Sequence, residues 1–156
     1  MRLYKSKNTG LEMNLRKLLF AKGFRYRIHD KRLPGTPDLV FPKYKAIIFL
    51  HGCFWHKHAG CSHGTIPKTN SAFWQSKFKR NKERDHTAFK QLIENGWRVL
   101  TVWECAFRSP KHFDADDLLS FIECWLTSDA TSCEVSGLEP LPVLELSIQL
   151  QVTKLN

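Results

Sequence analysis

The sequence lacks any run of about 18 apolar residues, so no part of its 156 residues predicts a membrane-spanning helix. Its first seven residues also lack the apolar segment of a secretory signal, which favours the cytoplasm. In that compartment, cysteines are expected to be reduced thiols or metal ligands. Their number is five, and an odd count fits poorly with a full disulfide framework.

Acidic side chains are scarce over most of the chain. Residues 1–127 carry 23 Lys and Arg against 11 Asp and Glu, whereas residues 128–156 carry one Lys and four acidic residues. The basic part therefore has an electrostatic reason to bind a polyanion, and nucleic acid is the first candidate. Basic surfaces also occur on proteins that bind no nucleic acid, so charge alone does not decide the function.

The apolar residues are sufficient for one compact domain. They make up 42% of the chain and include five Trp and eleven Phe, enough to fill an interior at this length. Because the composition changes after Thr127, we place a folded domain at residues 1–127 and a C-terminal tail at residues 128–156. Apolar and polar residues alternate in the tail from Val143 to Val152, which predicts a strand that could be added at a sheet edge.

The hydrophobic spacing within residues 1–127 predicts a mixture of helices and strands. Helices are expected at 10–22, 71–95 and 114–126, and strands at 24–29, 38–41, 45–50 and 97–103. Strand, long helix and strand in succession indicate a parallel pair, and hence an α/β fold. The polar residues Asn81 and Asp85 interrupt the apolar stripe of the long helix, so they either form internal hydrogen bonds or face a site. Cys124 is expected to be a small buried thiol.

Possible metal ligands are concentrated between Phe49 and Cys61. Cys53, His58 and Cys61 have the spacing C-x4-H-x2-C, and Cys105 follows the last predicted strand. Three sulfur ligands and one nitrogen suit a tetrahedral structural zinc site, with His63 as the substitute ligand if His58 points elsewhere. The alternative is that these are ordinary core or surface residues.

A second group of residues could cleave a phosphodiester. Asp38 opens one predicted strand, and His51 and His56 follow the next. A carboxylate at this position could hold magnesium, while His56 takes a proton from water and His51 contacts the phosphate or the leaving oxygen. A turn cap for Asp38 and solvated side chains for the two histidines are the alternatives.

Phe54 and Trp55 are adjacent aromatic residues in the same loop, and Trp74 opens the long predicted helix. Neighbouring side chains point in different directions, which makes such a pair hard to bury together. On a basic protein they could insert between base pairs as apolar wedges. As members of a core they would be unremarkable.

These motifs together resemble the very-short-patch repair (Vsr) endonucleases. The matching segments occur in the order of that family and cover about residues 1–126. They are Leu-Pro-Gly-Thr-Pro-Asp at 33–38, Phe-Leu-His-Gly-Cys-Phe-Trp-His at 49–56, Asn-Lys-Glu-Arg-Asp at 81–85, Gly-Trp-Arg-Val-Leu at 96–100 and Val-Trp-Glu-Cys at 102–105.

The resemblance implies a restriction-endonuclease-like mixed sheet flanked by helices, with a structural zinc site. It implies a bacterial, nucleoid-associated enzyme that nicks DNA 5′ of the T in a T:G mismatch, with magnesium as cofactor. The enzyme would act as a monomer, with mismatch-repair proteins as further candidate partners. Alternatives are a restriction-type nuclease that cuts paired DNA and a non-catalytic zinc-bearing DNA-binding module.

Residue roles also follow from the resemblance. Asp38 would bind magnesium together with the backbone carbonyl of Leu50, where the family often has threonine. His56 would be the general base, His51 would stand near the scissile phosphate, and Glu12 would support the histidines from the first helix. The intercalating residues would be Phe54, Trp55 and Trp74, and the zinc ligands Cys53, His58, Cys61 and Cys105. Of the basic N-terminal segment with which the family grips the minor groove, only residues 1–7 correspond here.

Overall fold

The computed structural model describes residues 10–144, apart from the side chain of Leu11. In chain order the elements are α1 (Gly10–Ala21), β1 (Arg27–Ile28), β2 (Leu39–Phe41), β3 (Ala46–His51), α2 (Ser71–Glu94), β4 (Arg98–Trp103), α3 (Cys105–Arg108), α4 (Ala115–Thr127) and β5 (Ser132–Val135). Short 3-10 turns occupy Pro42–Tyr44 and Ser62–Gly64. No helix within residues 10–144 is long and apolar enough to cross a membrane.

The five strands form one mixed sheet in the order β1-β2-β3-β4-β5. Strand β2 pairs antiparallel with β1 and β3, whereas β4 pairs parallel with both β3 and β5. The long helix α2 connects β3 to β4, which is the crossover that a parallel pair requires. The prediction of an α/β fold with a mixed sheet is confirmed.

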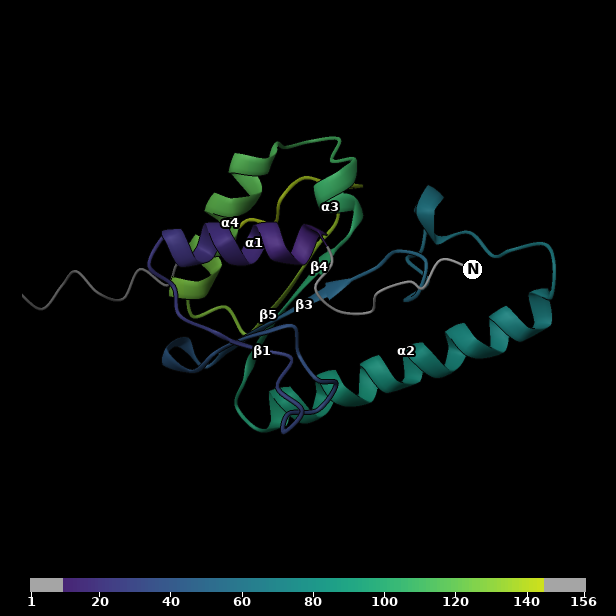
Figure 1. Ribbon diagram of the computed structural model, residues 1–156, viewed down its shortest axis with the longest axis horizontal. Coiled ribbons are helices and arrows are strands. Elements are labelled where there is room, and N and C mark those ends of the chain that lie inside the picture. Colours follow the sequence, from purple (N-terminus) through teal and green to yellow (C-terminus); the bar gives the residue numbers. More distant parts are fainter. Residues whose placement is uncertain (1–9, 145–156) are drawn as a thin grey trace, which may run out of the picture.

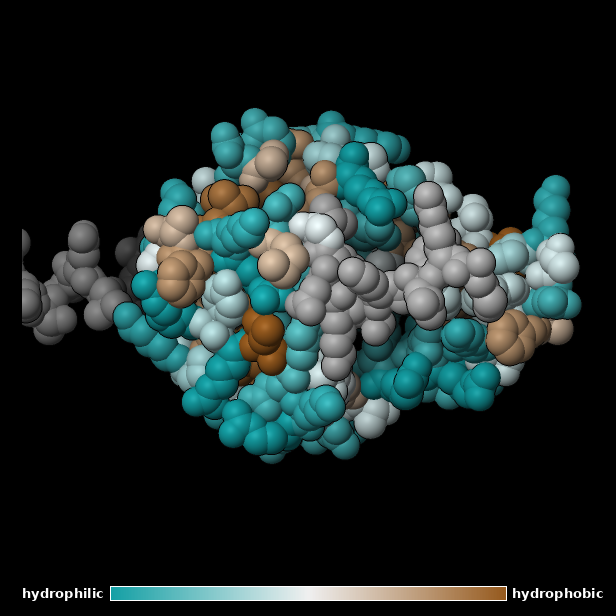
Figure 2. Space-filling view, viewed as in Figure 1, coloured by the Kyte–Doolittle hydropathy of each residue, from teal (hydrophilic) through white to brown (hydrophobic). Residues whose placement is uncertain are grey.

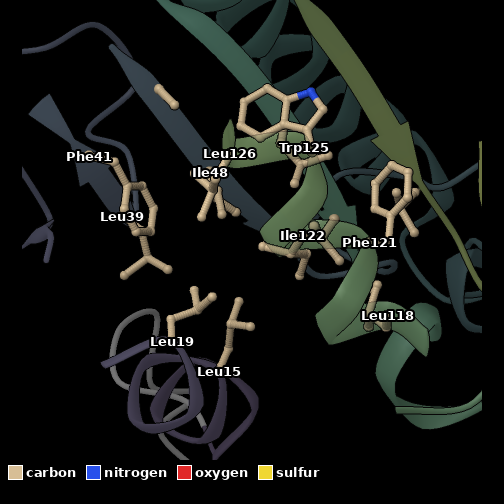
Figure 3. Packing of buried hydrophobic residues seen from close by; sticks show 14 of the residues in the cluster. Leu15, Leu19, Leu39, Phe41, Ile48, Leu118, Phe121, Ile122, Trp125 and Leu126 are labelled. Carbon is tan, nitrogen blue, oxygen red and sulfur yellow. The ribbon is translucent and has the colours of Figure 1, made fainter. Parts of the chain in front are cut away.

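Helices cover both faces of the sheet (Figure 1), with α1 and α4 on one face and α2 on the other. Alternating strand residues face opposite sides, which explains the division of the core. Ile48 packs towards α1 and α4 (Figure 3), and Leu100 belongs to the same cluster. Ile47 and Val99 pack towards α2 with Leu92. The sheet is therefore a rigid support whose edges can carry a site.

The structure shows which side chains of the helices are buried, and it corrects the prediction for Cys124. Leu18 of α1 is 49% exposed, so the buried stripe of that helix is formed by Leu15 and Leu19. On α2, Ala88 is the buried residue and Phe89 is exposed. Cys124 is also exposed, and the prediction of a buried thiol is wrong.

The strand predicted over residues 24–29 is reduced to Arg27–Ile28. Phe24 donates its backbone N–H to Leu19 and packs edge-on against Phe41, so it closes the C-terminal end of α1 before the strand begins. His29 ends the strand because its φ of 46° is left-handed. The strand is therefore short, but it still pairs with β2.

The C-terminal tail contributes β5 to the sheet, beside β4. The guanidinium of Arg98 donates to the carbonyls of Trp125, Leu126 and Ala130, which fixes the chain between α4 and β5. The strand predicted from Val143 to Val152 lies outside the described residues except for 143 and 144, which have no regular secondary structure. The division of the chain at Thr127 remains a prediction.

Candidate active site and metal centre

The sequence-predicted site residues gather at one end of the sheet. His51 is the last residue of β3, and its register partner on β4 is Trp103, also the last of its strand. Because β2 runs antiparallel to β3, Asp38, the residue just before β2, lies beside the end of β3. The loop after β3 leads towards the N-terminal end of α2 (Figure 1), so strands, loop and helix all contribute.

Four possible zinc ligands lie together at this end. Cys53, His58, Cys61 and Cys105 are all buried, and one ligand atom from each lies within 4.8 Å of the others. His58 Nδ1 is 3.5 Å from the sulfurs of both Cys53 and Cys105. Cys105 comes from α3, so this cluster ties the loop to the end of β4.

The donor set fits a tetrahedral zinc ion. Ligands about 2.0 to 2.3 Å from a common ion would be separated by about 3.5 Å, as the nitrogen and sulfur atoms are. Burial raises the pKa of the Cys53 and Cys105 thiols and lowers that of His58, whose neutral ring is the form that binds metal. His63 is exposed and lies outside the cluster.

Asp38 lies in a second cluster, with Glu12 and His29. One ligand atom from each lies within 4.8 Å of the others, so they could also hold a cation. His29 Nε2 is 2.8 Å from a Glu12 oxygen, and its Nδ1 is 3.9 Å from Asp38 Oδ1. The other Asp38 oxygen accepts the backbone N–H of Leu50 at 2.8 Å. Glu12 also pairs with Arg16 at 3.2 Å.

The environment of Asp38 favours its neutral form. Burial raises its pKa from 3.8 to about 6, and the negative charge of Glu12 acts in the same direction. The Leu50 hydrogen bond and the nearby His29 and His56 oppose this shift. The ionised form of Asp38 is therefore destabilised, and a bound cation would stabilise it by neutralising its charge.

His56 is held by an acidic partner from α2. Its Nδ1 is 2.6 Å from Asp85 Oδ2, and because an ionised carboxylate only accepts hydrogen bonds, Nδ1 is the donor. This fixes the tautomer in which Nε2 carries a lone pair. A histidine oriented in this way is equipped to accept a proton from water.

His51 stacks on His56, with ring centroids 3.9 Å apart and planes 2° apart. Burial lowers the pKa of His51 to about 3, and the neighbouring His56 contributes, so the ring is neutral near pH 7. Both rings and Asp85 have ligand atoms close enough to share a cation. Because the two rings are parallel, however, their in-plane lone pairs lie in separate parallel planes and do not converge on one ion.

Asn81 and Asp85, the two polar residues in the apolar stripe of α2, both hold the loop that follows β3. Asn81 donates to the backbone carbonyl of Trp55 at 2.9 Å, one helical turn before Asp85 contacts His56. Residues at i and i+4 lie on the same helix face, so both can reach adjacent loop positions. The sequence left open whether the two residues form internal hydrogen bonds or face a site. Both form hydrogen bonds inside the protein, and Asp85 also faces the candidate site.

The aromatic residues of the loop pack against the first turns of α2. Phe54 contacts Trp55 and Trp74 with centroids 5.0 and 5.2 Å away, and Phe78 at 5.3 Å. The ammonium of Lys77 lies 4.9 Å from the Trp55 ring. Phe54, Trp55 and Trp74 remain partly exposed, unlike the buried Phe78. The group is a projecting aromatic cluster and not part of the main core.

A groove of about 850 Å³ runs beside α2. One wall of the groove is lined by Lys77, Arg80 and Arg84 of α2. The other is lined by Pro34 and Gly35, which lie in the loop between β1 and β2. The surface over α2 is mostly hydrophilic, with hydrophobic side chains at its N-terminal end (Figure 2). A groove with several cationic side chains beside aromatic ones is suited to a nucleic acid backbone and its bases.

Close packing explains why residue 35, at the edge of the groove, is a glycine. Gly35 has a φ of 75°, and a side chain there would come within 2.9 Å of Ala88 and 3.1 Å of Phe49. The loop can therefore approach α2 and the sheet only because this residue has no Cβ. The approach helps place Asp38, three residues later, at the sheet edge.

Sequence reasoning did not assign a role to His29, which contacts Glu12 beside Asp38. The strand register could have identified His29. Ile28 pairs with Leu39 in antiparallel register, which places His29 opposite Asp38. Glu12, expected to support His51 and His56, contacts His29. Asp85 was recognised as a polar residue facing inward, but not as the partner of His56.

The chain is similar to curated DNA endonucleases. The sequence model of the family described as DNA mismatch endonuclease Vsr matches residues 1–62. The DNA mismatch endonuclease Vsr of Escherichia coli (strain K12) is 39% identical over 135 residues, which cover 86% of each chain. The Type II nicking enzyme V.XorIIP of Xanthomonas oryzae pv. oryzae is 47% identical over 105 residues, covering 67% of this chain and 76% of that protein.

The Type II nicking enzyme V.NmeAIP of Neisseria meningitidis serogroup A is 48% identical over 104 residues, or 67% of this chain and 74% of its own length. These alignments extend well beyond the residues that the family model matches. The mixed sheet flanked by helices and the buried Cys/His cluster agree with the same assignment. The chain therefore belongs to the Vsr family of restriction-endonuclease-like DNA mismatch endonucleases.

Proposed function

We propose that this endonuclease uses magnesium to nick DNA on the 5′ side of the thymine in a T:G mismatch. The contact of Asp85 with His56, together with the partly buried carboxylate of Asp38, is the observation that carries the proposal. Together they provide an oriented proton acceptor and a cation ligand at one end of the sheet. Such a mismatch arises when 5-methylcytosine deaminates, and the nick would start very-short-patch repair.

Asp38 and the backbone carbonyl of Leu50 would hold the magnesium ion. The Leu50 N–H fixes one Asp38 oxygen, and the other faces His29. Glu12 adds negative charge nearby, which increases the attraction for a cation. When bound, the ion would act as a Lewis acid and stabilise the charge that develops on the phosphoryl group.

His56 would remove the proton from the attacking water. Asp85 holds Nδ1, so Nε2 accepts that proton while the water oxygen forms its bond to phosphorus. The bond from phosphorus to the leaving sugar oxygen breaks in the same displacement, and that oxygen takes a proton from solvent water. The carboxylate of Asp85 then stabilises the imidazolium that results. Because His51 is neutral, it can donate an N–H hydrogen bond to the phosphate without adding a charge that would oppose protonation of His56.

The aromatic cluster would select a weakened base pair. Phe54, Trp55 and Trp74 would enter the stack of bases, where stacking on the rings offsets part of the lost base stacking. A mismatched pair requires less energy to unstack, so insertion favours it. Lys77 over Trp55 keeps a positive charge next to the DNA backbone.

The Cys/His cluster would hold a structural zinc ion. Cys53, His58, Cys61 and Cys105 would fill all four positions of a tetrahedral site, which leaves no open position for substrate. Its effect would be to fix the loop that carries both His56 and the aromatic cluster. A closed site of this kind stabilises the fold and does not take part in hydrolysis.

The proposed partner is double-stranded DNA that contains the mismatch, which would associate the protein with the nucleoid. We propose that the protein acts as a monomer, because the proposed mechanism uses no residue from a second copy. Other mismatch-repair proteins are further candidate partners after the nick.

The direct test uses labelled duplexes that differ in one base pair. With magnesium, a T:G duplex should be nicked in the thymine strand alone, whereas the matching T:A and C:G duplexes should remain intact. Omitting magnesium should abolish the nick. Cleavage of both strands in the paired duplexes would instead indicate a restriction-type nuclease, and tight mismatch binding without a nick would indicate a DNA-binding module.

A further inference from the structure

Trp103 lies between the Cys/His cluster and the histidine pair. Its ring stacks on His58, with centroids 4.1 Å apart and planes 5° apart. It also meets His51 nearly at right angles at 5.3 Å, and His56 in the same way at 6.4 Å. One indole therefore contacts a proposed zinc ligand and both histidines of the proposed reaction.

The indole is fixed from the C-terminal part of the chain. Trp103 Nε1 donates to Glu134 Oε1 at 2.5 Å. Glu134 lies on β5 opposite Thr101 of β4, so its side chain is on the same sheet face as Trp103 and reaches it diagonally. Trp103 itself is only 9% exposed. Glu134 is exposed, so its carboxylate supplies an acceptor at the surface for the N–H of a largely buried indole.

We propose that Glu134 is a positioning residue for the nicking reaction. Through its hydrogen bond it sets the orientation of the Trp103 indole, and that ring in turn sets the positions of His58, His51 and His56. The proposal rests on the nicking function proposed above. It also assigns a role to β5, which lies in the segment that the sequence marked only as a tail.

The physical reason is that ring contacts do not by themselves fix an indole. Stacking on His58 holds its plane but permits sliding within that plane, and edge contacts with His51 and His56 are weakly directional. The hydrogen bond to a carboxylate is directional and charge-assisted, and it removes this freedom. Without it, the orientation of the indole that the three histidines share is less strictly fixed.

The experiment compares three variants of the full chain. Glu134→Ala removes the acceptor, and Glu134→Gln keeps an acceptor oxygen but removes the charge. Glu139→Ala removes a negative charge from an exposed residue nearby in the chain and serves as the control. The measurements are the imidazole NMR resonances of His51, His56 and His58, the rate of zinc transfer to a chelator, and single-turnover nicking with the affinity for the T:G duplex.

Glu134→Ala should shift all three imidazole resonances, speed zinc transfer and slow single-turnover nicking by about tenfold, with unchanged DNA affinity. Glu134→Gln should restore most of each property, and Glu139→Ala should match the unmodified chain. A loss of DNA affinity with a normal single-turnover rate would overturn the proposal, as would unchanged resonances. Equal defects in Glu134→Gln and Glu134→Ala would also overturn it, because charge and not the hydrogen bond would then matter.

The resonances and zinc transfer do not require nicking. If the unmodified chain failed to nick a T:G duplex, the proposed function would fail, while the resonances would still show whether Glu134 orients the rings.

Discussion

At the scale of single residues, Asp38 shows a conflict between stability and function. Its pKa rises from 3.8 to about 6, chiefly because it is buried, so the folded protein binds its proton more tightly than the unfolded chain. The stability that this proton contributes is fully present below about pH 4 and is lost as the pH rises through 6. Ionised Asp38 therefore destabilises the fold unless a cation is bound.

Asp38→Asn should consequently stabilise the protein at pH 8 in magnesium-free buffer. A shift of about two pKa units corresponds to about 3 kcal/mol at most. Urea unfolding at pH 8 and pH 4.5 measures this. The variant should be more stable by about 1–3 kcal/mol at pH 8, and most of that difference should vanish at pH 4.5. A variant that is less stable at both pH values would contradict the burial argument.

Asp85 gives the second prediction at this scale. Asp85→Asn keeps the shape of the side chain but removes the charge that stabilises protonated His56, and it can invert the tautomer of that ring. We expect single-turnover nicking to fall by about 10² or more, with little change in DNA affinity. Glu94→Gln, at the exposed C-terminal end of the same helix and outside the groove, is the control. Normal nicking by the Asp85 variant would remove Asp85 from the mechanism.

At the scale of elements, the loop after β3 depends on its cysteines. Cys61→Ser should lower the zinc content and the melting temperature, because the ion would stabilise only the folded loop. Metal analysis and calorimetry on freshly purified protein measure both. Cys124→Ser, at an exposed cysteine outside the cluster, should change neither. Equal zinc content in the two variants would rule out the four-ligand site.

The first turns of α2 and the loop form the proposed wedge. Trp55→Ala should weaken T:G binding by about 1–3 kcal/mol, the range for one base stacked on an aromatic side chain. Binding to a paired duplex should change less, because insertion is proposed for the mismatch. Phe89→Ala, also a partly exposed aromatic on α2, is the control. If both variants bound the mismatch as the unmodified chain does, the aromatic cluster would not be a wedge.

Sequence patterns predicted those features whose residues are close together or strongly periodic. Cys53, His58 and Cys61 share one loop, and α2 has a long helical stripe. The role of His29 depends on the register of β1 with β2, which a two-residue strand barely signals. The strand β5 was missed because Ser132–Val135 is short and mostly exposed, with only Val135 fully buried.

At the scale of the whole molecule, the sheet assembles a site from distant parts of the chain. Asp38 comes from the position just before β2, His51 from β3, Trp103 from β4 and Glu134 from β5, while α2 supplies Asp85. None of these groups can act before the sheet forms, which links catalysis to global folding. The sequence motifs indicated the family, but only the folded structure shows which residues hold the motif residues in place.

The central claim is that hydrolysis depends on the cation held at Asp38. Single-turnover nicking of a T:G duplex in magnesium by Asp38→Asn tests it, with mismatch affinity measured on the same preparation. We expect the rate to fall by about 10³ or more while the variant still binds the mismatch and remains folded. Nicking by Asp38→Asn at the rate of the unmodified chain would contradict the account.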